Sequence, residues 1–146
     1  MFTGSYYNTI DSKGRALIPV KFRYSLGERV RLVRGVDACL YVFTQETWAA
    51  FEQKYINNLD LTDENARELQ RFLLGGEHEL EVDKVGRINL PKDSALYAGL
   101  DKEVAFVGCG DRVELWDAEI YLNKMKPGNL DPSKLMREAA RASGGE

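Results

Sequence analysis

Short runs in which apolar and polar residues alternate predict most of the strands of this chain. We expect strands over residues 2–10, 15–18, 29–33, 39–43, 77–82, 87–90, 103–107 and 112–116. Between them, apolar residues recur at helical spacing, with Pro, Thr or Asp at several starts and Gly at several ends. This spacing predicts helices over residues 20–26, 44–57, 61–74, 91–98 and 118–125.

The same pattern occurs twice along the chain. Asp11-Ser12-Lys13-Gly14-Arg15 returns seventy-two positions later as Asp83-Lys84-Val85-Gly86-Arg87. Each copy precedes a short apolar strand that ends in proline. Further matches pair Gly27 with Gly99, Gly35 with Gly108, Val42-Phe43 with Leu115-Trp116, and Trp48 with Tyr121. Because glycine is matched with glycine and aromatic with aromatic, we interpret the chain as an internal duplication.

This duplication sets the expected organisation of the 146 residues, a length that fits one ordinary domain or two very small ones. We interpret residues 1–60 and 77–126 as two related units, joined by a helix over residues 61–76. Residues 127–146 form a C-terminal tail, with a weakly helical stretch at 133–142 and a polar end. Such an end is expected to be mobile.

Each copy of the repeated motif predicts a tight turn with a basic tip. Asp11 and Asp83 can bond the turn backbone, and Gly14 and Gly86 supply the positive φ that such turns need. The arginine at the fifth position carries a planar fork that matches the O6 and N7 acceptors of guanine and also suits phosphate. A two-stranded ribbon is narrow enough to enter the major groove of DNA.

Arg15 and Arg87 are therefore candidate DNA contacts, and Lys13 and Lys84 add charge beside them. The alternative is that the Asp and Arg of each copy simply pair and fix the turn, as structural residues of a duplicated fold.

The charge distribution bears on this choice. The net charge is −3, but residues 1–34 carry seven basic and two acidic side chains, against thirteen and twenty-one in the remainder. Such segregation can create a local positive field in an acidic protein. The alternative is a set of ordinary solvated strand faces.

Composition narrows the class of protein. The chain is 44% hydrophobic and 29% charged, as in soluble globular proteins. No segment approaches the roughly 18 apolar residues of a membrane helix, and the first residues lack the features of a signal peptide. We therefore expect a cytoplasmic protein.

Cysteine and histidine usage argues against a metal centre. Cys39 and Cys109 lie far apart within strand-like segments and are expected to be buried, reduced thiols. His78 is the only histidine, and neither cysteine has a close Cys or His partner, so we expect no metal site and no cofactor. Aromatic residues such as Trp48 and Trp116 fall on apolar faces and are expected in the core.

The two Asp-x-x-x-Arg motifs and their spacing carry a resemblance to a known family. Together with the opening Phe2-x-Gly4-x-Tyr6 and the following Asn8-Thr9-Ile10-Asp11, they resemble the MraZ family of bacterial transcriptional regulators through residue 125. Each half looks like the swapped-hairpin DNA-binding unit of the AbrB and SpoVT type, in which two chains exchange hairpins. The resemblance implies an α+β, mainly β fold: two pseudo-twofold halves forming one small β-barrel with flanking helices.

The resemblance also implies a function. MraZ proteins form closed rings, octamers or dodecamers, and bind G-rich direct repeats ahead of the division and cell-wall gene cluster that begins with their own gene. A nucleoid-associated homo-oligomer on double-stranded promoter DNA is therefore expected. Arg15 and Arg87 would be the principal DNA contacts and Lys13 and Lys84 secondary ones. Asp11 and Asp83, with their glycines, would shape the turns.

Two other classes of protein compete with this interpretation. An enzyme is disfavoured because His78 has no Ser or Cys nucleophile beside it and no phosphate-binding Gly-rich loop is present, so no small-molecule substrate is expected. An antitoxin or other protein-interaction module is the second, since antitoxins share the hairpin unit. Antitoxins usually carry one such unit and a separate toxin-binding tail.

Overall fold

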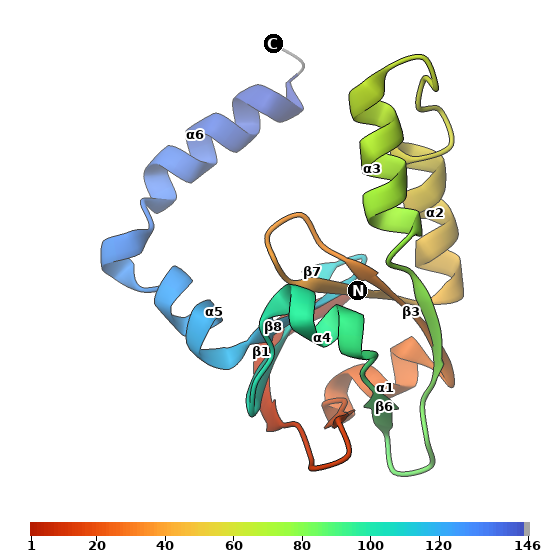
Figure 1. Ribbon diagram of the computed structural model, residues 1–146. Coiled ribbons are helices and arrows are strands. Elements are labelled where there is room, and N and C mark those ends of the chain that lie inside the picture. Colours follow the sequence, from red (N-terminus) through yellow and green to blue (C-terminus); the bar gives the residue numbers. More distant parts are fainter. Residues whose placement is uncertain (145–146) are drawn as a thin grey trace.

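The computed structural model describes residues 1–144, which form a sheet, a short ribbon and six α-helices (Figure 1). The strands are β1 (Phe2–Thr9), β2 (Arg15–Leu17), β3 (Arg29–Arg34), β4 (Leu40–Phe43), β5 (His78–Glu81), β6 (Arg87–Asn89), β7 (Glu103–Gly110) and β8 (Val113–Asp117). The helices are α1 (Val20–Leu26), α2 (Gln45–Tyr55), α3 (Glu64–Leu74), α4 (Lys92–Ala98), α5 (Ala118–Lys124) and α6 (Pro132–Ser143), with a 3₁₀ turn, η1, at Pro127–Asn129.

The expected strands and helices are present, with two clear differences of extent. Strand β7 continues through Gly110 instead of ending at residue 107, because its last residues pair with the start of β1. Helix α3 begins at Glu64 rather than at residue 61, because the Asp63 side chain accepts a hydrogen bond from Ala66 N at 3.1 Å and caps the helix there.

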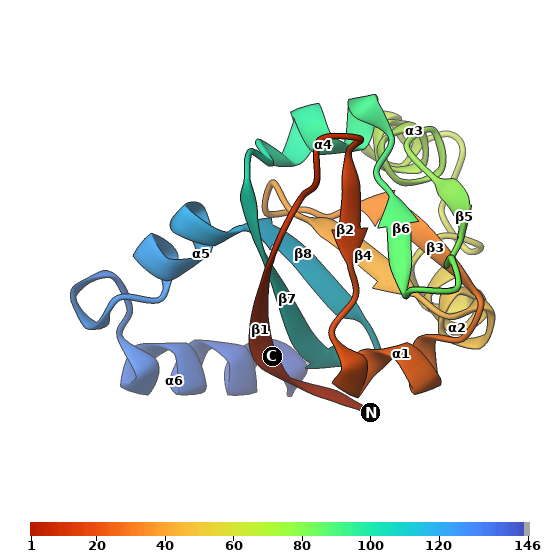
Figure 2. The same ribbon diagram turned by 90° about the horizontal axis from the view of Figure 1, so that it is seen from below.

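Six strands form an antiparallel sheet in the order β1-β7-β8-β4-β3-β5, and β2 pairs with β6 in a separate two-stranded ribbon. The ribbon lies over one face of the sheet (Figure 2). Elements β1-β2-α1-β3-β4-α2 recur as β5-β6-α4-β7-β8-α5, so the sheet order reads the same from either end when repeat-related strands are exchanged. The pseudo-twofold relation therefore passes between β4 and β8.

Most of the strand pairing crosses between the repeats. Strand β1 pairs with β7, β3 with β5, β4 with β8, and β2 with β6, so only β3–β4 and β7–β8 join neighbours within one repeat. The strands on either side of the first turn share only one isolated bridge, between Ile10 and Ala16. Each turn is thus a hairpin tip whose two arms separate immediately and pair with the other repeat.

The expectation of a closed β-barrel is wrong, since the sheet is open. Its edge strands β1 and β5 lie at opposite ends of the strand order. Strands β2 and β6, which could have joined the edges, are only three residues long and pair with each other. They cover one face of the sheet. The fold is α+β and mainly β, as expected.

The core has two parts, one on each face of the sheet. Between the sheet and the ribbon lie buried side chains that include Ile18, Phe22 and Ile88, each at most 1% exposed. Phe22 packs edge-on against the rings of Phe2 and Tyr6. The opposite face is covered by α2 and α3 over a second cluster, whose buried aromatic side chains include Phe43, Trp48 and Trp116. The expected core role of these aromatic residues is confirmed.

The C-terminal tail contains helix α6, which extends from the body of the molecule as an arm (Figure 1). Its residues are all exposed. The final residues, Gly145 and Glu146, lie outside the described part of the chain, so the expectation of a mobile end is untested. No helix among residues 1–144 has the length and apolar character needed to cross a membrane.

The two cysteines are free thiols. Cys39 is fully buried, whereas Cys109 near the end of β7 is only half-buried. Burial raises the pKa of both thiols, that of Cys109 to about 11. Both are therefore protonated and unreactive at neutral pH.

Candidate nucleic-acid interface

The first turn is organised by the carboxylate of Asp11. Its Oδ1 accepts hydrogen bonds from the backbone N–H groups of Lys13 and Arg15, both at 2.9 Å. Its Oδ2 accepts a bond from Arg15 Nε at 2.8 Å. Backbone bonds from Gly14 N to Asp11 O (3.0 Å) and from Asp11 N to Arg15 O (2.9 Å) close the turn, with Gly14 at φ +79°. A left-handed φ of this kind suits glycine.

The second turn repeats these contacts almost atom for atom. Asp83 Oδ1 accepts hydrogen bonds from the N–H groups of Val85 and Arg87, at 3.0 and 2.8 Å, and also from Gly86 N at 3.0 Å. Arg87 Nε donates to Asp83 Oδ2 at 2.8 Å, and Gly86 has φ +101°. The two turns therefore share one construction, as the duplication predicts.

The Asp–Arg pairing considered as a structural alternative is thus present in both turns. It engages only the Nε of each arginine. Among residues 1–144, no acceptor is bonded to the terminal amino groups of Arg15 or Arg87, which keep four of the five guanidinium donors for another molecule. Each arginine side chain is 29% exposed. The pairing therefore orients the guanidinium and leaves its forked end available.

The β2–β6 ribbon brings the two arginines to one surface. Arg15 pairs with Asn89, and Leu17 pairs with Arg87, while Ala16 and Ile88 between them are completely buried. Because side chains alternate across a strand, Arg15 and Arg87 both lie on the outer face of the ribbon. They are diagonal neighbours, whose Cα atoms are about 7–8 Å apart in such a register. The sequence did not reveal this juxtaposition, because the two residues are seventy-two positions apart.

Both ends of the ribbon are fastened in the same way. Ile18 N donates to Gly86 O at 2.9 Å, and Leu90 N donates to Gly14 O at 3.0 Å. Each turn of one repeat is therefore bonded to the residue that follows the ribbon strand of the other. These reciprocal bonds hold the two turns at opposite ends of the ribbon (Figure 2).

The turn carboxylates titrate below their usual range. The pKa values of Asp11 and Asp83 are lowered from 3.8, chiefly by the backbone hydrogen bonds from Arg15 and Arg87. Desolvation is the second-largest effect and opposes this, while the arginine side chains lower the pKa values further. A carboxylate whose pKa is lower in the folded protein than in the unfolded chain stabilises the fold at pH values above its pKa in the unfolded chain. This contribution is lost as the pH falls through the folded pKa.

We therefore expect the Asp11→Asn/Asp83→Asn variant to be less stable than the wild type mainly above pH 4. The difference between their free energies of unfolding should stay constant from pH 5 to 8, because both wild-type carboxylates are ionised there. It should shrink below pH 3.8 as they are protonated. Urea unfolding followed by circular dichroism across this range measures it. A difference that is unchanged down to pH 2.5 would contradict the role of the charged form.

The two candidate lysines occupy different places. Lys13 and Lys84 are both exposed, at the third position of the first turn and the second position of the second turn.

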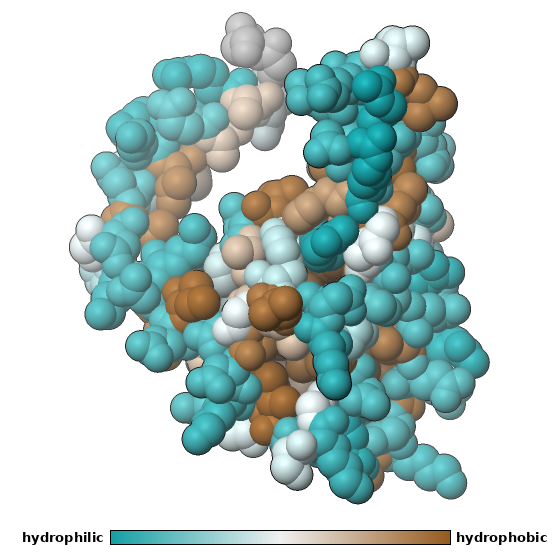
Figure 3. All heavy atoms as spheres, in the orientation of Figure 1, coloured by the Kyte–Doolittle hydropathy of each residue, from teal (hydrophilic) through white to brown (hydrophobic). Residues whose placement is uncertain are grey.

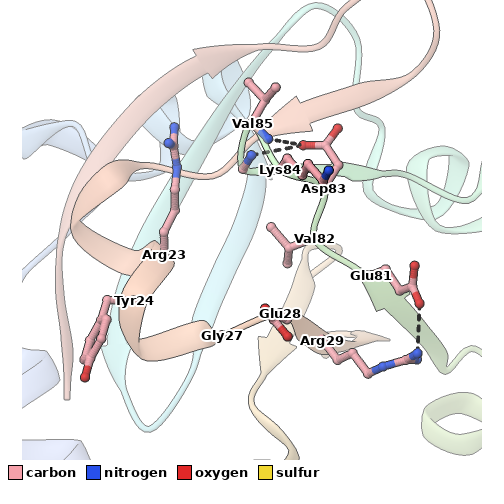
Figure 4. A pocket seen from close by; sticks show the side chains of 11 residues that line it. Arg23, Tyr24, Gly27, Glu28, Arg29, Glu81, Val82, Asp83, Lys84 and Val85 are labelled. Carbon is pink, nitrogen blue, oxygen red and sulfur yellow. Dashed lines mark hydrogen bonds and ion pairs between the residues drawn. The ribbon is translucent and has the colours of Figure 1, made fainter.

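Beside the second turn is a hollow lined by residues of α1, β3, β5 and the turn itself (Figure 4). Arg23 from α1 lies there against Gly86, and its Nε donates to Ile18 O at 2.7 Å. Arg23 was not predicted, because its equivalent in the other repeat is Ala95.

His78 is held at the surface by a neighbouring acid. Its Nε2 lies 3.0 Å from Asp93 Oδ2, and this hydrogen bond is the first cause that lowers the pKa of Asp93. No cluster of three or more His, Cys, Asp or Glu side chains suited to a metal ion occurs within residues 1–144.

Comparison with known proteins places the duplicated turns in a family. The model of the family described as "MraZ protein, putative antitoxin-like" matches residues 1–72 and 73–126, once for each repeat. The chain belongs to the MraZ family. This confirms the family membership inferred from the repeated motif and the N-terminal residues.

Two relatives are similar to this chain over most of their length. The transcriptional regulator MraZ of Carboxydothermus hydrogenoformans is 46% identical over 123 residues, which cover 84% of this chain and 85% of that protein. The transcriptional regulator MraZ of Acetivibrio thermocellus is 45% identical over 140 residues, or 96% and 97% of the two chains. Both MraZ relatives are named as regulators of transcription and neither as an enzyme.

Proposed function

We propose that this protein is a sequence-specific, DNA-binding transcriptional regulator rather than an enzyme. The observation that carries the proposal is the arrangement of Arg15 and Arg87: both lie on the outer face of one ribbon, and each is held by its Nε with its forked end free. Paired arginines at this spacing suit guanine edges or phosphates in a groove. The names of the two relatives support this role.

The finer parts of the proposal follow from the family resemblance. We infer that the target is double-stranded promoter DNA with G-rich direct repeats, ahead of the protein's own gene and the division and cell-wall cluster. The site of action is then the nucleoid in the cytoplasm. Lys13 and Lys84 add phosphate contacts, and Asp11 and Asp83 keep the turns in shape, since a carboxylate is repelled by phosphate.

A ring-shaped homo-oligomer, an octamer or a dodecamer, is part of the same proposal. Each chain offers only two arginine-tipped turns, and several chains bound to repeats in register would gain affinity through effective concentration. Exposed apolar side chains are available for such contacts: Tyr24 on α1 is 96% exposed, and Leu96, its equivalent on α4, is 84% exposed. Figure 3 shows apolar side chains at the surface beside α4 and along the α5–α6 arm. Surfaces of this kind favour association.

Fluorescence anisotropy tests the proposal directly. The full-length protein is titrated into a duplex from immediately upstream of its own gene and into a shuffled duplex of the same composition, over a series of salt concentrations. We expect tight binding to the upstream duplex only, with log K falling by about 0.9 per phosphate contact for each tenfold rise in salt. Equal, weak binding to both duplexes would overturn sequence-specific regulation and favour the antitoxin-like alternative.

A further inference from the structure

The two ends of the ribbon differ in charge, although the two turns share one construction. At the first turn, a hollow is lined by Ser12, Lys13, Gly14, Asn89, Leu90, Pro91 and Lys92. This lining contains two lysines and no acid. The hollow at the second turn is lined by Arg23, Arg29 and Lys84 together with Glu28, Glu81 and Asp83, so its charges balance.

The cationic hollow is assembled from both repeats. Lys13 belongs to the first turn, whereas Asn89 and Lys92 come from the end of β6 and the start of α4 in the second repeat. The bond from Leu90 N to Gly14 O, at 3.0 Å, holds the two segments together. Figure 2 shows the first turn beside the start of α4.

Both lysines in this hollow are free to meet an anion. Lys13 and Lys92 are exposed, and neither forms an ion pair within residues 1–144. The acid next to Lys92, Asp93, is directed to His78, and Asp11 is occupied by Arg15 and the turn backbone. Asn89 is also exposed and lies opposite Arg15 in the ribbon register. Cations, an amide and the Arg15 fork therefore share one surface.

The second end has apolar residues at the positions equivalent to Lys92, Lys13 and Asn89, while Lys84 stands where the first turn has Ser12. Seventy-two positions relate Lys92 to Val20 and Lys13 to Val85, and the same shift relates Asn89 to Leu17. Val20 is 75% exposed and Val85 is 56% exposed, so these side chains are also at the surface. The repeat therefore conserves the turn but not the charge beside it.

We propose that Lys92, together with Lys13 and Asn89, forms a phosphate-binding site at the first turn that has no counterpart at the second. This inference rests on the proposed function and adds a residue from outside the repeated motif. Unequal ends also give the ribbon a direction: a phosphate held at the first turn favours one of the two orientations that a pseudo-twofold ribbon could take in a groove. A direct repeat, unlike a palindrome, requires such a fixed orientation at every copy.

The test compares Lys92→Ala with Lys54→Ala and Lys92→Arg, by anisotropy on the upstream duplex over a salt series. Lys54, an exposed lysine on α2 across the sheet from the ribbon, controls for the loss of one positive charge. We expect Lys92→Ala to bind the upstream duplex about two- to tenfold more weakly than the wild type. The slope of log K against log salt concentration should become less steep by about 0.9 for each chain that contacts DNA. Lys54→Ala and Lys92→Arg should keep wild-type affinity and slope.

Wild-type affinity and slope for Lys92→Ala, with specific binding by the unmodified protein intact, would overturn this inference and leave the proposed function standing. Equal losses for Lys92→Ala and Lys54→Ala would also overturn it, since they would show only a general charge effect. If the unmodified protein does not distinguish the upstream duplex from the shuffled one, the proposed function itself is wrong.

Discussion

Replacing Arg15 and Arg87 together by alanine should abolish specific DNA binding while the fold and assembly remain. A well-placed arginine on a base edge contributes about 1–3 kcal/mol, so removing both from one ribbon should weaken binding by about thirtyfold or more. The fold should lose little, because ion pairs that stay in contact with solvent contribute little to stability. Each arginine is bonded to its aspartate, and the backbone bonds of the turn do not depend on the side chain.

The measurements are anisotropy on the upstream duplex, thermal unfolding, and mass in solution by light scattering. Arg71→Ala/Arg141→Ala is the matched control, since both arginines form exposed ion pairs with an acid three residues away and lie outside the ribbon. Loss of folding in Arg15→Ala/Arg87→Ala alone would show that the Asp–Arg pairs are structural. Unchanged DNA binding by a folded double variant would show that neither arginine belongs to the DNA interface.

Replacing Gly108 by alanine is expected to produce the largest loss of stability from a single added methyl group. Gly108 lies opposite Gly4 where β7 pairs with β1, and a Cβ there would overlap the backbone nitrogen of Thr3 and lie 2.5 Å from the carbonyl carbon of Phe2. Backbone cannot move aside as a flexible side chain can. The strands must separate locally, which costs about 1–3 kcal/mol.

Gly128→Ala is the control for this variant, because nothing lies within 4 Å of a Cβ at that position in η1. Surface changes of this kind alter stability by about 0.5 kcal/mol or less. Urea unfolding at fixed protein concentration compares the two. Equal unfolding midpoints for Gly108→Ala and Gly128→Ala would show that β1 can shift without cost.

The turns and most helix ends were predictable from the sequence because their causes are local. Asp11 bonds N–H groups two and four residues ahead, and the Thr44 and Asp117 side chains cap the helices that follow them. Such contacts depend on spacing along the chain and on residue type. The duplication and the family membership could also be inferred from the sequence, since both are patterns of residues.

The pairing of the strands could not be predicted from the sequence in this way. Alternation fixes which side chains share a face of a strand, but not which strand lies alongside, because pairing depends on contacts between distant segments. The family resemblance implied a closed barrel, whereas the chain folds as an open sheet covered by a two-stranded ribbon. The need for glycine at position 108 has the same origin, since only the approach of β1 excludes a side chain there.

The sequence by itself determined the elements, the two Asp–Arg turns and the family. Only the tertiary structure decided that Arg15 and Arg87 share one outer face, and that Lys92 lies beside the first turn while Val20 occupies the equivalent place. The physical reason is that β2 and β6 are too short to stand alone and are stabilised by pairing with each other across the repeats, which brings together side chains seventy-two positions apart.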